Sequence, residues 1–285
     1  MQDRLTGNDP VSLLIMVVFP HCKINLGLHV LYKRADGYHE LDTCFYPITF
    51  HDLLEVLPAK NFSVTLTGLA IPGNKTDNIC VMAYRLLQQE YQLPNISIHL
   101  HKEVPIGAGL GGGSSDGVFT LKALNTIFNL GITPEKMLHY ASQLGSDCAF
   151  FCQDNPMIGR GRGELLSPVS VSLKHFYLIL LKPPIHISTK TAFAGLKPKE
   201  RKVSIEKIVT QVPVDKWKDH LSNDFEESIF KLYPKIEACK TKLYDHGAVY
   251  ASMTGSGAGV YGLFNNETDV VKFQDKNLIW RGRLL

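Results

Sequence analysis

The sequence has no internal repeat, no low-complexity tract and little net charge. Its apolar stretch at residues 13–19 is too short to span a bilayer, and it lacks the basic start and small-residue cleavage site of a signal peptide. A formal charge of +3 does not make the basic stripe that nucleic-acid binders carry, although it suits an anionic small molecule. We therefore expect a cytoplasmic globular protein that binds neither nucleic acid nor membrane.

Cysteine is sparse and shows no framework. The six cysteines are scattered through a chain that is long enough to have a core: Cys22, Cys44, Cys80, Cys148, Cys152 and Cys239. Such scattering argues against a disulfide scaffold. Cys148 and Cys152 could be a metal-binding pair, but no second Cys/His pair follows at a zinc-like spacing. Buried free thiols are the favoured interpretation.

The most informative stretch, residues 105–116, is rich in glycine and reads PIGAGLGGGSSD. It follows an alternating segment, residues 96–101, and precedes a run of helical spacing from Val118 to Phe128. Glycine tolerates positive φ and has no Cβ, so the backbone here can wrap closely around a ligand. Ser114, Ser115 and Asp116 then fall at a helix N-terminus, whose unpaired N–H groups favour an anion. The stretch predicts a phosphate-binding loop.

Two familiar glycine motifs do not explain this stretch. It has no Gly-Lys-Ser/Thr ending, so it is not a Walker-type loop. Gly107, Gly109 and Gly112 have G-x-G-x-x-G spacing, but a Rossmann fingerprint belongs in the first βα unit, not after about a hundred residues. A flexible linker is the remaining alternative, and the close framing by a strand and a helix start argues against it.

The other patterns predict an α+β protein in two lobes, with a boundary between residues 159 and 172 that gives domains 1–165 and 166–285. Strands are predicted at residues 13–19, 20–33, 41–49, 52–57, 62–67, 176–182, 249–253 and 260–264. Helices are predicted at residues 79–91, 133–144, 188–196 and 224–246, the last bent at Pro234. The buried stripe of the first helix comprises Ile79, Met82, Ala83, Leu86 and Leu87. Residues 197–215 are charged and weakly patterned. Met16 is an alternative candidate for the first residue of the natural protein.

Three motifs, in this order, resemble the GHMP kinase superfamily: Lys23-Ile-Asn-Leu-Gly27, residues 105–116, and Thr254-Gly-Ser-Gly-Ala258. Two further segments narrow the resemblance. Arg34-Ala-Asp-Gly-Tyr-His-Glu-Leu41 and Leu144-Gly-Ser-Asp-Cys-Ala-Phe-Phe151 are similar to the 4-diphosphocytidyl-2-C-methyl-D-erythritol kinase family. The resemblance extends from about Val18 to the C-terminal end.

The resemblance implies a ribosomal-S5-domain-2-like N-terminal lobe that holds ATP and a ferredoxin-like C-terminal lobe. It implies transfer of the ATP γ-phosphate, with Mg²⁺, to the 2-hydroxyl of the methylerythritol moiety in the non-mevalonate isoprenoid route. The expected partner is this small molecule, and the expected state is a monomer or a homodimer. The alternatives are another GHMP kinase, acting on homoserine, mevalonate or a sugar, and a non-catalytic sensor on the same scaffold.

The resemblance also assigns roles to residues that are otherwise ambiguous. Asp147 matches the catalytic aspartate and is the candidate base, although a helix-flanking cap is the simpler interpretation without the resemblance. Lys23 matches the catalytic lysine, which would keep Asp147 ionised, whereas a strand lysine is ordinarily solvated. Asn25, on the same strand face, resembles a substrate-contacting position. Cys148-Ala149 departs from the aliphatic residue and proline that many relatives have after the aspartate.

The ligand-binding positions are carried over in the same way. Tyr38 and His39 resemble the residues that read the cytosine, with mere packing as the alternative. Phe45 and Phe193 match positions that sandwich the base, and Thr189 is a nearby polar contact. The expected ATP-binding residues are Pro105, Gly107, Gly109, Leu110, Gly111, Gly112, Gly113, Ser114 and Ser115, with Asn78 on the adenine side. Ser115 is also the candidate Mg²⁺ ligand.

Overall fold

The computed structural model of the chain describes residues 15–196 and 198–284. Its strands are β1 (Met16–Val18), β2 (His21–Lys33), β3 (His39–His51), β4 (Leu53–Pro58), β5 (Ser63–Gly68), β6 (Ile96–Lys102), β7 (Met157–Gly161), β8 (Leu165–Pro168), β9 (Tyr177–Leu181), β10 (Tyr250–Met253), β11 (Val260–Phe264) and β12 (Leu278–Arg283). Its helices are α1 (Ile79–Tyr91), α2 (Gly112–Ile127), α3 (Pro134–Leu144), α4 (Thr189–Ala194), α5 (Ile205–Gln211), α6 (Trp217–His220), α7 (Glu226–Leu232), α8 (Pro234–Asp245) and α9 (Glu267–Lys272). Short 3₁₀ helices η1 (Lys75–Asp77), η2 (Cys148–Cys152) and η3 (Val214–Lys216) join them.

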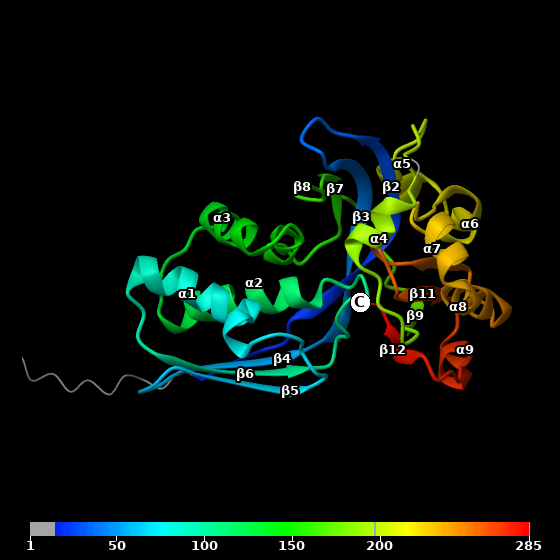
Figure 1. Cartoon of the computed structure of the whole chain (residues 1–285). Helices are drawn as coiled ribbons and strands as arrows, with labels where there is room; N and C mark the ends of the chain where they lie inside the picture. Colours follow the sequence, from blue (N-terminus) through cyan, green and yellow to red (C-terminus); the bar gives the residue numbers. More distant parts are fainter. Residues whose placement is uncertain (1–14, 197, 285) are drawn as a thin grey trace, which may run out of the picture.

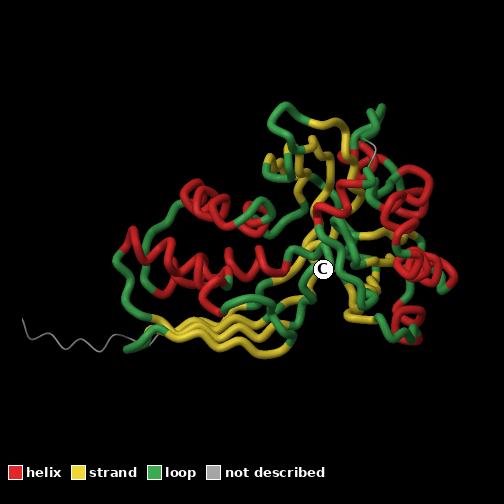
Figure 2. The backbone as a smooth tube through the Cα atoms, in the orientation of Figure 1, coloured by secondary structure: helices red, strands yellow, loops and turns green. Residues whose placement is uncertain are grey.

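The N-terminal lobe is a sheet covered on one face by helices. Within the described residues, its strands lie in the order β1-β4-β6-β5. The alternation in β6 turns Ile96, Ile98 and Leu100 into a core with α1 and α2, and Figures 1 and 2 show these helices on one side of the strands. Residues 103–111 connect β6 to the N-terminus of α2, so the glycine-rich stretch that was predicted to bind phosphate lies at the start of this helix.

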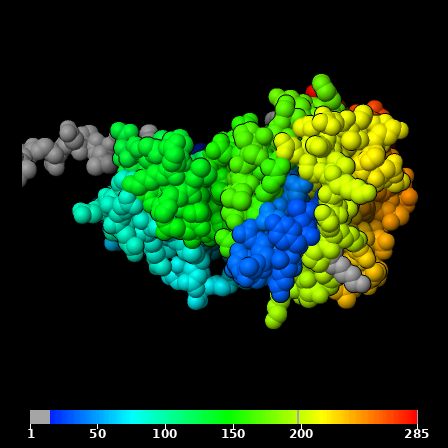
Figure 3. Space-filling view, turned by 90° about the horizontal axis from the view of Figure 1, so that it is seen from above, coloured from blue at the N-terminus to red at the C-terminus, as the bar shows by residue number. Residues whose placement is uncertain are grey.

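A second sheet, β2-β3-β7-β8, rises from the middle of the molecule. The long antiparallel pair β2 and β3 places Lys23 opposite Pro47 and Asn25 opposite Phe45. The predicted turn at residues 36–37 joins the two strands. In the view from above, this blue segment lies between the green N-terminal lobe and the yellow part of the C-terminal lobe (Figure 3).

The C-terminal lobe has the strand order β10-β11-β9-β12, with every neighbouring pair antiparallel. Together with the helices between β9 and β10 and helix α9 before β12, this order is that of a ferredoxin-like fold. The two-lobed α+β prediction is thus confirmed. The predicted division at residues 165/166 falls in β8, which pairs with β7, and residues 1–14 and 285 lie outside the described residues.

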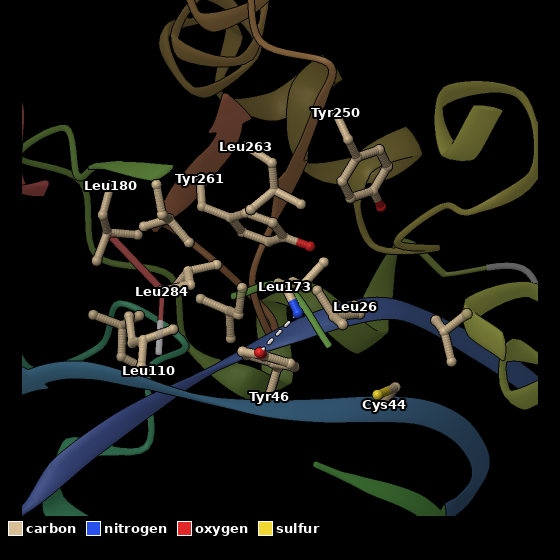
Figure 4. Close-up of a cluster of buried hydrophobic side chains, with 14 of the residues drawn as sticks. Leu26, Cys44, Tyr46, Leu110, Leu173, Leu180, Tyr250, Tyr261, Leu263 and Leu284 are labelled. Atoms are coloured by element: carbon tan, nitrogen blue, oxygen red, sulfur yellow. Dashed lines mark hydrogen bonds between the residues drawn. The ribbon is translucent and has the colours of Figure 1, made fainter. Parts of the chain in front are cut away.

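A shared hydrophobic cluster joins the lobes (Figure 4). It brings together Leu26 from β2, Leu110 from the glycine-rich stretch and Tyr261 from β11. The Tyr46 hydroxyl accepts a hydrogen bond from the Leu173 backbone N–H at 3.0 Å. Because residues from both lobes fill one core, the segments that carry the predicted site are held in a fixed relative position.

Several local predictions need correction. The helix expected at residues 224–246 is two helices, α7 and α8, because Tyr233 leaves the helical region (φ −134°, ψ 73°) and Pro234 starts a new helix instead of bending the old one. Met82 was predicted to belong to the buried stripe of α1 but is 43% exposed, whereas Tyr84, which was not predicted, is buried. Residues 197–215 contain α5, capped by Ser204. The first strand is only Met16–Val18, and residues 13 and 14 lie outside the described part.

The cysteines are free, as expected, and all are buried except Cys152, which is partly buried. All six are free thiols, and burial raises the pKa of each of them, including that of Cys152 to about 11. Within residues 15–196 and 198–284, no helix is long and apolar enough to cross a membrane.

Candidate active site

Two glycine loops from different lobes meet at the centre of the molecule. We call residues 105–111 the phosphate loop and residues 254–259 the C-terminal glycine loop. Gly109 has φ +74°, and a Cβ on it would lie 2.0 Å from the carbonyl oxygen of Thr254. A Cβ on Gly259 would lie 2.4 Å from the carbonyl oxygen of Ala108. The two backbones are thus in direct contact, which only glycine permits at these positions.

The phosphate loop borders a cavity of about 330 Å³, which we call the nucleotide cavity. Gly107, Gly109 and Gly111 all have positive φ, as the sequence predicted. Gly112 and Gly113 instead form the first turn of α2, whose N-cap is Gly111. Among the described residues no side chain caps this turn. Its N–H groups and the positive end of the helix dipole therefore remain for an anion.

Almost all of the predicted nucleotide-binding residues line this cavity: Asn78, Pro105, Gly107, Gly109, Leu110, Gly111, Gly112, Gly113 and Ser114. Asn78 also caps α1, because its side-chain oxygen accepts a hydrogen bond from the Cys80 N–H. Ser115 differs from the others. It does not line the cavity, it is fully buried, and its hydroxyl has no hydrogen-bond partner within the described part of the chain.

A buried ion cluster lies under the phosphate loop. The ammonium group of Lys102 contacts Asp52 Oδ2 at 2.5 Å and Asp116 Oδ2 at 2.7 Å. The other oxygen of Asp52 accepts hydrogen bonds from the backbone N–H groups of Glu103 and Val104. Burial raises the pKa of Asp116, the charge of Lys102 lowers it, and Asp52 raises it. The cluster ties β4, β6 and α2 together beneath the nucleotide cavity, and sequence analysis did not detect it.

We expect Lys102→Met to lower the free energy of unfolding by about 3–5 kcal/mol at neutral pH, because it leaves two carboxylates buried together. A carboxyl group whose pKa is higher in the folded than in the unfolded protein stabilises the folded state when the pH is below its unfolded-state pKa. This stabilisation is lost as the pH rises through its folded-state pKa. The deficit of the variant should therefore shrink as the pH falls towards 5. Urea unfolding at both pH values measures this.

Lys199→Met is the matched control, because Lys199 is half exposed and pairs with Glu227 on the surface. Surface pairs contribute about 0–1 kcal/mol. Equal losses in the two variants, or a deficit for Lys102→Met that does not depend on pH, would contradict the assignment of a buried ion cluster.

A second cavity, of about 930 Å³, opens on the other side of the phosphate loop, and we call it the acceptor cavity. It shares Gly109, Gly111 and Ser114 with the nucleotide cavity. The remaining predicted site residues all line it: Lys23, Asn25, Tyr38, His39, Phe45, Asp147, Thr189 and Phe193. A nucleotide and a second molecule can therefore meet across the phosphate loop.

Lys23 and Asp147 lie where the two cavities join. The Lys23 ammonium donates hydrogen bonds to Asn25 Oδ1 at 2.7 Å and to the Gly109 carbonyl at 2.9 Å. Its distance to Asp147 Oδ2 is 3.9 Å. Burial lowers the pKa of Lys23, while the negative charge of Asp147 raises it. An ammonium group has three N–H donors, so one remains for a ligand beside the Asp147 carboxylate, which is 37% exposed.

Several aromatic side chains line the acceptor cavity. Tyr38 is exposed at the β2–β3 turn, with the Arg162 guanidinium 4.7 Å from its ring centre. The His39 ring stacks on Phe193 at 4.9 Å, and burial lowers the pKa of His39, as does the nearby charge of Lys33. Phe45 is buried deeper, tilted against Phe150. A base held between Phe45 and Phe193 stays a prediction.

Sequence analysis missed several residues of this cavity. Arg162 and Glu164 come from the β7–β8 turn, and Lys190 and Phe225 come from the C-terminal lobe. Gly161 and Gly163 around Arg162 have positive φ and are the one local signal of a tight turn there. The other two residues reach the cavity only through the docking of the lobes.

The chain is similar to known kinases in sequence and in structure. The family described as GHMP kinases N terminal domain matches residues 78–155, and GHMP kinases C terminal matches residues 215–278. A Bacteroides fragilis protein named 4-diphosphocytidyl-2-C-methyl-D-erythritol kinase is 48% identical over 261 residues, which cover 90% of this chain and 95% of that protein.

Two solved structures extend the comparison. A crystal structure of 4-(cytidine 5'-diphospho)-2C-methyl-D-erythritol kinase superposes with a TM-score of 0.79 at 28% identity, covering 90% of this chain and 93% of that one. The Methanococcus jannaschii mevalonate kinase shares the fold, with a TM-score of 0.70 at 14% identity over 96% of this chain and 99% of its own.

Proposed function

Since the chain belongs to the 4-diphosphocytidyl-2-C-methyl-D-erythritol kinase family of the GHMP kinases, we propose that Lys23 and Asp147 carry its phosphoryl transfer. The chain is an ATP-dependent kinase that phosphorylates the 2-hydroxyl of 4-diphosphocytidyl-2-C-methyl-D-erythritol in the non-mevalonate isoprenoid route. The observation that carries the residue assignment is the junction of the two cavities at the phosphate loop, with both side chains beside it.

The proposed mechanism relies on positioning and charge. The ATP phosphates lie against the phosphate loop and the N-terminus of α2, and the acceptor hydroxyl reaches them from the acceptor cavity. Asp147, whose Oδ2 lies 3.9 Å from the Lys23 ammonium, accepts the hydroxyl proton. The free N–H of Lys23 stabilises negative charge on the transferring phosphoryl group. Phosphoryl transfer needs little covalent help from the protein, so this alignment provides most of the rate enhancement.

We also propose that ATP is used with Mg²⁺. Among the described residues no three His, Cys, Asp or Glu side chains gather into a metal site, which fits a cation held mainly by phosphate oxygens and water. The protein ligand would be the unpartnered Oδ1 of Asp116, because Asp116 lines the nucleotide cavity. Ser115, the ligand expected from the sequence, is fully buried and does not line this cavity. When bound, Mg²⁺ neutralises charge on the phosphates.

We propose that Tyr38 and His39 read the cytosine of the substrate. The exposed Tyr38 ring offers a stacking face, and its contact with Arg162 holds it in place. With its pKa lowered, His39 is a neutral ring that can both donate and accept a hydrogen bond. Thr189 and Phe193 would complete this end of the acceptor cavity.

Tyr38→Ala should raise the KM for the cytidine substrate roughly 5- to 150-fold, which corresponds to about 1–3 kcal/mol for one stacked base. The KM for ATP should change far less, because Tyr38 does not line the nucleotide cavity. Tyr38→Phe keeps the ring and is the control, with a near-native KM. Equal changes in the KM of both substrates would mean that this turn does not read the base.

The unit of function is proposed to be a monomer or a homodimer in the cytoplasm, where ATP is available, with a small molecule as its partner. Size-exclusion chromatography with light scattering distinguishes the two states.

The test of function is an ADP-release assay with ATP and Mg²⁺ that compares 4-diphosphocytidyl-2-C-methyl-D-erythritol with homoserine, mevalonate and galactose. Turnover with the cytidine compound alone is expected. Preferred turnover of another alcohol would overturn the proposed reading of the cytosine. A folded protein that binds ATP without any turnover would act as a sensor on this scaffold.

A further inference from the structure

Asn223 lies outside both cavities, yet its side chain is linked to Lys23 by buried hydrogen bonds. Its amide nitrogen donates to the carbonyl oxygens of Met253 at 2.8 Å and Gly255 at 2.9 Å. Its amide oxygen accepts from the Phe225 N–H at 3.0 Å. The side chain is 2% exposed and every polar atom is used. Such a satisfied buried amide imposes a definite geometry on its partners.

The two carbonyls flank Thr254, so Asn223 fixes the first turn of the C-terminal glycine loop. With its carbonyl held in this way, Gly255 directs its N–H to Asn25 Oδ1 at 2.9 Å. The same oxygen accepts the hydrogen bond from the Lys23 ammonium. The amide nitrogen of Asn25 donates to Thr43 Oγ1 at 2.8 Å, which determines which end of the amide faces Lys23.

The segment that carries Asn223 is itself attached to the strand of Lys23. The Leu28 N–H donates to the Ser222 carbonyl, and the Asp224 N–H donates to the Leu28 carbonyl. Strand β2, residues 222–224 and the C-terminal glycine loop therefore form a closed ring of contacts. A displacement of the loop by a fraction of an ångström would reach Lys23 through Asn25, because each link is a buried hydrogen bond.

We propose that Asn223 is a positioning residue for the phosphoryl transfer: it orients the Lys23 ammonium through Gly255 and Asn25. The proposal rests on the role given to Lys23 above. An amide is required because one nitrogen must serve two carbonyls while the oxygen accepts a backbone N–H. Asp has the same shape but no donor when ionised, and Gln is one methylene longer.

Asn223→Asp should lower kcat by about 10²-fold, the scale of a misplacement remote from the chemistry. The KM values for ATP and the cytidine substrate should change by less than roughly threefold, because Asn223 touches neither cavity. In ¹⁵N-labelled ligand-free protein, the hydrogen-bonded ammonium signal of Lys23, assigned by its absence in Lys23→Met, should shift or broaden.

Asp224→Asn is the matched control, since it makes the reverse exchange at the next residue. Asp224 accepts a hydrogen bond from the Val30 N–H and pairs with Arg201, away from the C-terminal glycine loop. This variant should lose stability while keeping kcat and the Lys23 signal. A folded Asn223→Asp protein with native kcat, or with reduced kcat and an unchanged Lys23 signal, would overturn the proposal.

If Asn223→Asp does not fold, Asn223→Ser retains one hydroxyl donor, and the same two measurements apply with a smaller expected loss of kcat. Failure of the proposed function is recognised separately. Native kcat in Lys23→Met would remove Lys23 from the mechanism, whereas the ammonium signal in Asn223→Asp would still report whether Asn223 orients it.

Discussion

Asp147→Asn is expected to lower kcat by about 10²- to 10⁴-fold, the usual contribution of a positioned general base. The amide keeps the size of the carboxylate but cannot accept the hydroxyl proton or carry charge beside Lys23. Binding should survive, because the proposed contacts of ATP are with the phosphate loop and those of the cytidine end of the substrate are with Tyr38 and His39. Steady-state kinetics and calorimetric titration with each ligand measure the two effects separately.

Asp154→Asn is the matched control for this substitution. Asp154 lies beyond the other end of η2, is 65% exposed, and forms surface pairs with His21 and Lys122. Its exchange should leave kcat within about twofold, since such pairs contribute little. If Asp147→Asn lost no more than tenfold, Asp147 would orient the acceptor instead of accepting its proton, as a loose transition state permits.

Gly109→Ala is expected to reduce kcat/KM for ATP at least about 10²-fold, because it separates the two glycine loops on which the alignment depends. The new methyl group would lie 2.0 Å from the Thr254 carbonyl oxygen, which is backbone and cannot rotate away. Overpacking and positive φ together should also lower the free energy of unfolding by about 2–5 kcal/mol. Chemical denaturation and kinetics with varied ATP test both effects.

Gly131→Ala separates the two causes. Gly131 also has positive φ (+62°), but within the described chain nothing lies within 4 Å of where its Cβ would be. It lies between α2 and α3 and borders neither cavity. This control should lose about 1–2 kcal/mol of stability through backbone strain alone and keep native kcat/KM. Similar kinetics in the two variants would show that contact between the loops is not required.

Much of the local structure could be predicted because it depends on neighbours in sequence. The alternation of residues 96–101 gave β6, and Asn78 and Thr133 marked the starts of α1 and α3. The single helix expected at residues 224–246 was wrong for a comparable local reason. Proline at a helix start and proline inside a helix leave similar patterns, and tertiary packing chooses between them.

In the candidate site, too, some residues could be predicted from local sequence and others only from tertiary packing. Every predicted nucleotide- and substrate-binding residue except Ser115 lines one of the two cavities. Most of them lie in short motifs with distinctive composition, whereas Phe45, Thr189 and Phe193 were carried over from the family resemblance alone. Lys102 and Asn223 carry no such signal, and Arg162 is marked only by the glycines on either side of it. In the sequence, a lysine that is buried between two aspartates looks the same as a lysine that is exposed to solvent. Only the packing of β4, β6 and α2 shows that Lys102 is buried.

The sequence by itself therefore determined the phosphate loop, the Tyr38–His39 turn and membership of a kinase family, since glycine at positive φ and motif spacing are properties of the local chain. Only the tertiary structure decided how these parts act together. The approach of Lys23 to Asp147, the contact between the two glycine loops and the link from Asn223 to Lys23 all join residues far apart in sequence. Packing within the N-terminal lobe sets the first of these distances, and the docking of the two lobes around one core sets the other two. No local pattern encodes either of them.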